Sequence, residues 1–93
     1  MEAGEQLLLE NALDALDRLF DRECGAIDVW ALLVATAAAL RDTPHRAALE
    51  EPLAELEAIW RSRSSADSQR DRAIAVTDPL RHYLARLLPP PRM

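Results

Sequence analysis

Lysine is absent from this sequence, and cysteine, glycine and aromatic residues are scarce. The single cysteine, Cys24, cannot form a disulfide within the chain, which weakly favours a reducing compartment. The two glycines form neither a phosphate-binding loop nor a nucleophile elbow. All eleven basic residues are arginines, which together with the many alanines is typical of a GC-rich bacterial genome.

Long apolar runs are also missing. The longest stretch without a charge extends from Val29 to Leu40, whereas a membrane-spanning helix needs about 20 apolar residues. The N-terminal sequence MEAGEQ is acidic and lacks the apolar run of a signal peptide. We therefore expect a cytoplasmic protein without a membrane segment.

The composition that remains favours helices. Hydrophobic residues make up 49% of the 93 residues and aromatic residues 4%, so the core must be built from leucine, alanine, valine and isoleucine. No segment alternates between β-branched and polar residues, as strands do. We predict a single helical domain, residues 1–93, folded as a compact all-α bundle of four to five helices.

Apolar residues recur with helical spacing at the N-terminal end. One row contains Leu9, Leu13, Leu16 and Phe20, which predicts a helix over about 5–24. Gly25 is expected to end this helix in the left-handed conformation, and Asp28 to cap the next one. The second helix, at about 29–41, is apolar on every side, which predicts a central position in the fold or a contact with another chain.

Prolines and serines divide the second half of the chain. Pro52 and Pro79 each interrupt an apolar stripe, which predicts helices that are kinked or broken there. The two segments ALEEPLAEL and AVTDPLRHYL resemble each other, but too few positions match to indicate a repeat. The serine-rich segment 61–70 predicts an internal loop, with Ser68 capping the last helix. A proline-rich tail, 89–93, ends the chain.

The sequence contains few candidates for chemistry. His45 and His82 are isolated, and zinc sites use three or four Cys, His or acidic ligands. Cys24 follows Glu23 near a helix C-terminus, where the negative helix end and the acid both disfavour a thiolate. We therefore predict no catalytic residue, no metal site and no cofactor, and hence a protein that is not an enzyme.

Acidic residues are the strongest positional signal. They recur at steps of four, three and four on the first predicted helix, which places them along one ridge: Glu10, Asp14, Asp17 and Asp21. A second acidic surface is expected at Glu50, Glu51 and Glu55. Residues 1–28 hold eight acids and two arginines (net −6), residues 29–60 five and two (−3), and residues 61–93 three and seven (+4). The ridge could be a solvated face, could pair with the C-terminal arginines, or could bind a basic partner.

Three functions remain open. We favour an acidic protein-binding module that covers a basic surface of another protein, through the seven acids of the ridge and the second acidic surface. In size, charge and helical class such a protein resembles bacterial immunity proteins and antitoxins, although it shares no motif with them. One alternative is a structural or regulatory homodimer that associates through the apolar helix at 29–41. Another is a nucleic-acid accessory protein using the arginine-rich segment 61–72, which a pI near 4.9 disfavours.

Overall fold

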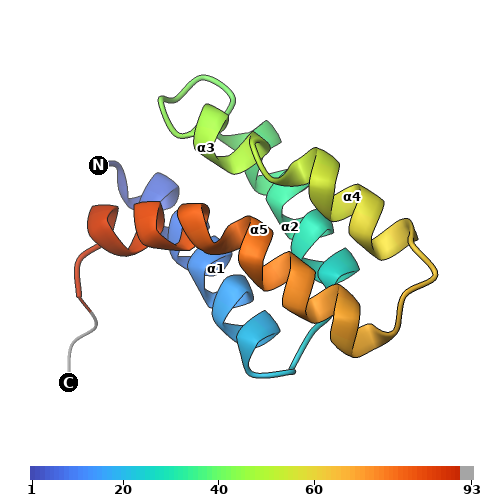
Figure 1. Cartoon of the computed structure of the whole chain (residues 1–93). Helices are drawn as coiled ribbons and strands as arrows, with labels where there is room; N and C mark the ends of the chain where they lie inside the picture. Colours follow the sequence, from blue (N-terminus) through green and yellow to red (C-terminus); the bar gives the residue numbers. More distant parts are fainter. Residues whose placement is uncertain (91–93) are drawn as a thin grey trace.

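A computed structural model describes residues 1–90 and confirms an all-α bundle (Figure 1). Its five helices are α1 (Ala3–Phe20), α2 (Ala26–Ala39), α3 (Arg46–Glu50), α4 (Leu53–Arg61) and α5 (Ala66–Leu87). Pro89 and Pro90 follow α5 outside any helix, and the remaining predicted tail, 91–93, lies outside the described residues. No strand occurs in the described part of the chain.

The four longer helices form a ring around one core. α1 packs between α2 and α5, and α4 closes the ring by packing between the same two helices. The core consists mainly of leucines, among them Leu9, Leu33, Leu56 and Leu84, all with no exposed surface. α2 contacts each of the other four helices, which confirms its predicted central position.

Both predicted proline effects occur. Pro52 separates α3 from α4, because it has no backbone N–H to donate to the carbonyl of Ala48. Pro79 lies inside α5, which continues through it but bends near its middle (Figure 1). Asp78 therefore does not begin a separate helix, because tertiary packing on both sides of the bend holds α5 together.

The junction between α1 and α2 differs from the prediction. α1 ends at Phe20, four residues before the predicted end, and Arg22 rather than Gly25 takes the left-handed conformation, with a φ of 64°. Gly25 is the N-cap of α2, and Asp28 lies in the first turn, where its carboxylate accepts the Gly25 N–H at 2.8 Å. The acid still caps the helix, but from inside its first turn.

The predicted loop 61–70 is mostly helical. Only residues 62–65 lie outside the helices, because Ser65 rather than Ser68 caps α5 and its hydroxyl accepts the Ser68 N–H at 3.1 Å. Competing capping serines are close together in this segment, and sequence alone did not select between them. The side-chain amide of Gln69 stabilises the turn by donating hydrogen bonds to the carbonyls of Ser62 and Ser64.

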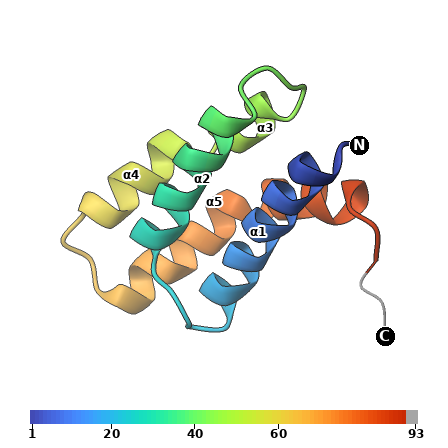
Figure 2. The same ribbon diagram turned by 180° about the vertical axis from the view of Figure 1, so that it is seen from behind.

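Two apolar surfaces stay exposed. Phe20, predicted to belong to the core row, is 59% exposed, and the guanidinium of Arg81 lies 5.8 Å from its ring centre. The outer face of α2 is the second surface, and α2 lies in front of α5 in Figure 2. The exposed residues of α2 are, except for Asp28 in the first turn, all apolar: Ile27, Ala31, Val34, Ala35, Ala38 and Ala39.

Candidate functional site

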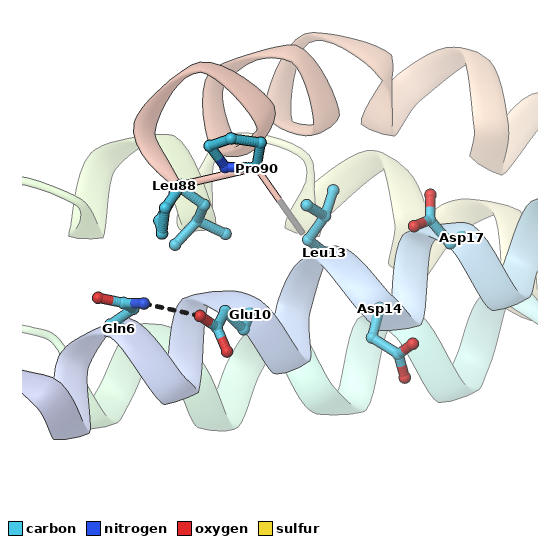
Figure 3. Close-up of a pocket in the computed structure, with 8 residues that line it drawn as sticks. Gln6, Glu10, Leu13, Asp14, Asp17, Leu88 and Pro90 are labelled. Atoms are coloured by element: carbon cyan, nitrogen blue, oxygen red, sulfur yellow. Dashed lines mark hydrogen bonds between the residues drawn. The ribbon is translucent and has the colours of Figure 1, made fainter. Parts of the chain in front are cut away.

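A hollow lies between α1 and the end of α5. We call it the acidic groove; its volume is about 570 Å³ and it is lined by Gln6, Glu10, Leu13, Asp14, Asp17, Leu88, Pro89 and Pro90. In Figure 3, Leu88 and Pro90 lie across from Leu13 of α1. The groove thus combines an apolar wall with three of the four predicted ridge acids, and no arginine of the described residues 1–90 belongs to its lining.

The four ridge acids have different surroundings. Glu10 accepts a hydrogen bond from the Gln6 side chain at 2.8 Å (Figure 3), and Asp14 lies 3.6 Å from Arg18, with both side chains exposed. Asp17 turns toward α5, whereas Asp14 points away from it (Figure 3). Asp21 caps the end of α1 outside the groove, and its carboxylate has no ion-pair partner among residues 1–90.

One C-terminal arginine reaches the ridge. Arg81 of α5 donates to Asp17 Oδ1 from Nη2 at 2.8 Å and from Nε at 3.1 Å. Arg61 pairs instead with Glu57 on its own helix, and Arg70 pairs with Asp67. Within the described part of the chain, the internal match between the acidic and basic ends is therefore limited, at the ridge, to Asp17.

The second predicted acidic surface also contains both paired and unpaired acids. Glu50 is bound by Arg46 at 3.0 Å. Glu51 and Glu55 line two smaller hollows between α3, α4 and α5, and neither has an ion-pair partner in the described part of the chain. The structure thus places the seven predicted binding acids on separate surfaces.

Sequence reasoning did not find a polar cluster that joins three elements. The buried His45 shares a 2.6 Å hydrogen bond between its Nδ1 and the hydroxyl of Tyr83 on α5. Its Nε2 lies 3.7 Å from Glu5 of α1. These residues are far apart in the sequence and share no local pattern, so only the packing of the helices could bring them together.

Cys24 has the surroundings of a structural thiol. Its Sγ lies 3.7 Å from the carbonyl oxygen of Ala15, to which it donates. Burial, followed by the charge of Asp28, raises the pKa of the Cys24 thiol. A raised pKa lowers the thiolate fraction at neutral pH, and the thiolate is the nucleophilic form.

The second histidine lies on the surface of α5. His82 Nδ1 is 3.3 Å from a carboxylate oxygen of Asp78, four residues before it on the same helix. In residues 1–90, no three His, Cys, Asp or Glu side chains lie close enough to hold a metal ion. No helix in the same range is long and apolar enough to cross a membrane.

The arginines of segment 61–72 do not form one surface. Arg61 lies over the Trp60 ring at 4.6 Å, and Trp60 in turn contacts Trp30 of α2, with 5.3 Å between ring centres. Arg70 is largely buried, with a side chain 16% exposed, and Arg72 lines one of the smaller hollows. Intramolecular contacts therefore occupy two of the four arginines.

Comparison with known proteins adds no family to this description. No protein-family model, no curated protein and no solved structure matches the chain.

Proposed function

We propose that this protein is a binding module, acting without catalysis, that holds a basic and partly apolar segment of another protein in the acidic groove. The observation that carries the proposal is the composition of the groove, in which Glu10, Asp14 and Asp17 lie beside Leu13 and Leu88, with no arginine of residues 1–90 in the lining. A basic side chain with an aliphatic stem would satisfy both the carboxylates and the apolar wall.

The rigidity of α1 supports this proposal. Its buried residues Leu9, Ala12 and Leu16 anchor the helix in the core, so the carboxylates are held on a fixed backbone. Clustered charge of one sign accelerates encounter with a partner of opposite sign and disfavours wrong partners. Covering a basic surface in this way is how an inhibitor of the immunity or antitoxin type would act.

Site-specific cross-linking in cells of the source organism tests the proposal. A photoreactive residue at Gln6, inside the groove, should capture a partner through a peptide rich in arginine or lysine, and one at Asn11, outside the lining, should not. Glu10→Gln with Asp14→Asn should abolish the capture, and added salt should weaken it.

A matched variant separates the groove from general charge effects. Glu23→Gln with Asp42→Asn removes the same two charges at exposed positions outside the groove and should leave the capture unchanged. If both double variants capture the same partner as well as the native chain, the acidic groove is a solvated surface and the proposal fails.

A second candidate function is self-association through α2. The exposed stripe of this helix supports it, because Ile27 is 48% and Val34 39% exposed and no charge interrupts the helix between Val29 and Leu40. Light scattering at micromolar concentration would show a dimer that Val34→Glu dissociates; a monomeric native chain would exclude this function.

A further inference from the structure

A second groove follows the contact between α3, α4 and α5. It consists of two hollows of about 270 Å³ each, which share Val76. Ala58, Ile59 and Ala75 line the first hollow, together with Glu55 and Arg72. The second is lined by Ala48, Glu51, Pro52, Pro79, Leu80, Tyr83 and Arg86 in addition to Val76. We call the two together the seam groove.

Two prolines lie at this groove. Pro52, where α3 and α4 separate, and Pro79, where α5 bends, line the same hollow. Neither proline has an N–H, so the carbonyls of Ala48 and Ala75 lose their usual helical donors. Both alanines line the seam groove. The similarity of the segments ALEEPLAEL and AVTDPLRHYL therefore has a structural counterpart, since their prolines meet here.

The two sides of the seam groove carry opposite charges. Glu51 and Glu55 lie on the side of α3 and α4, whereas Arg72 and Arg86 lie on α5. Among residues 1–90, none of these four side chains has an ion-pair partner within 4.0 Å, even though Glu55 and Arg72 line the same hollow. The floor between them is apolar.

We propose that the seam groove binds an amphipathic helix of a partner protein that has one basic and one acidic edge. Its apolar stripe would lie on the floor around Val76, its basic edge against the two glutamates, and its acidic edge against the two arginines. A groove between helices is a common receptor for such a helix. Arg72 and Arg86 are fourteen residues apart on α5, which bends at Pro79 between them, so the groove extends over at most about 21 Å, or roughly four helical turns.

The charges decide between possible occupants. A uniformly basic segment would meet Arg72 and Arg86, and a uniformly acidic one would meet Glu51 and Glu55; like charges that face each other weaken binding. The exposed apolar face of α2 in a second copy is uncharged from Val29 to Leu40 and would leave all four charges unpaired. This inference uses a surface separate from the acidic groove and does not depend on the proposed function.

Three labelled synthetic helices of about fourteen residues test the inference against the full chain. All have the same leucine stripe; one has an arginine edge and a glutamate edge, one has two arginine edges and one has two glutamate edges. Fluorescence anisotropy should show binding of the two-sign helix, with the other two about tenfold weaker, because each brings like charges together on one side. Equal binding of all three would overturn the proposal.

Charge reversal gives a readout that unfolding cannot imitate. Glu51→Arg with Glu55→Arg makes both sides of the groove basic, so the chain should lose the two-sign helix and gain the helix with two glutamate edges. Glu10→Gln with Asp14→Asn, in the acidic groove, should leave the preference unchanged. If the reversed variant keeps the native preference, or if sedimentation shows a dimer of the native chain that Glu51→Arg with Glu55→Arg dissociates, the proposal is wrong.

Discussion

The acidic groove, beside the end of α5, and the seam groove, along α5, differ in charge. The acidic groove is lined by carboxylates and an apolar wall, whereas the seam groove has glutamates on one side and arginines on the other. The difference comes from how α5 contributes. Toward α1 it offers one arginine, Arg81, which is already bound to Asp17, and Leu88 follows its last turn. Toward α3 and α4 it offers two arginines that have no ion-pair partner in the described residues.

This comparison shows that net charge alone is a poor guide to a binding surface. The chain as a whole has a net charge of −5, yet one of its grooves presents both signs. Charge selects the class of partner only where the fold leaves it unpaired and next to an apolar surface, because exposed pairs contribute little. On that basis Glu10, which has no ion-pair partner among residues 1–90, is the acid through which the acidic groove selects a basic segment, and the seam groove selects a two-sign helix.

The largest loss of stability is expected from a change in the core beside both grooves. Leu84 of α5 has no exposed surface and belongs to the hydrophobic core. Leu84→Ala should lower the free energy of unfolding by about 2–5 kcal/mol, because it leaves a cavity. Urea unfolding measures this loss, and Ala85→Ser, at the exposed neighbouring position, is the control. A loss below about 1 kcal/mol would contradict the packing described for α5.

A smaller loss of stability is expected from a change at a residue that lines the seam groove only. Tyr83 lines that groove, and its hydroxyl is bound to Nδ1 of the buried His45. Tyr83→Phe should lower the free energy of unfolding by about 1–3 kcal/mol, because a buried nitrogen loses its partner. Thermal and urea unfolding measure this, with His82→Asn at an exposed position as the control. Equal stability of Tyr83→Phe and the native chain would mean that the cluster contributes nothing to the fold.

The smallest loss of stability is expected from a substitution that makes the acidic groove more acidic and leaves the seam groove unchanged. Arg81→Ala releases Asp17, and because both side chains are nearly half exposed, the stability should fall by only about 0–1 kcal/mol. The acidic groove would gain an unpaired carboxylate, so cross-linking from position 6 to a basic partner should increase. Arg86→Ala removes one arginine from the other side of α5 and serves as the control. Similar cross-linking in both variants would show that Asp17 takes no part in binding.

The sequence predicted the helices better than their ends. Leucine spacing identified the bundle, and proline chemistry identified the two interruptions, because both effects are local. The boundary residues were less certain, since several polar residues could cap the same helix: Arg22 replaced Gly25 and Ser65 replaced Ser68. Small differences in local energy decide such choices, and tertiary contacts are large enough to override them.

For the candidate sites too, some features follow from the sequence and others only from the tertiary structure. By itself the sequence determined the helical class, the positions of the acids on α1 and the uncharged length of α2, because helical periodicity places residues on faces without reference to the rest of the chain. Only the tertiary structure decided that Arg81 binds Asp17, that His45 meets Tyr83 and that Pro52 and Pro79 line one hollow. Such contacts join residues tens of positions apart, and the packing of one helix against another sets them.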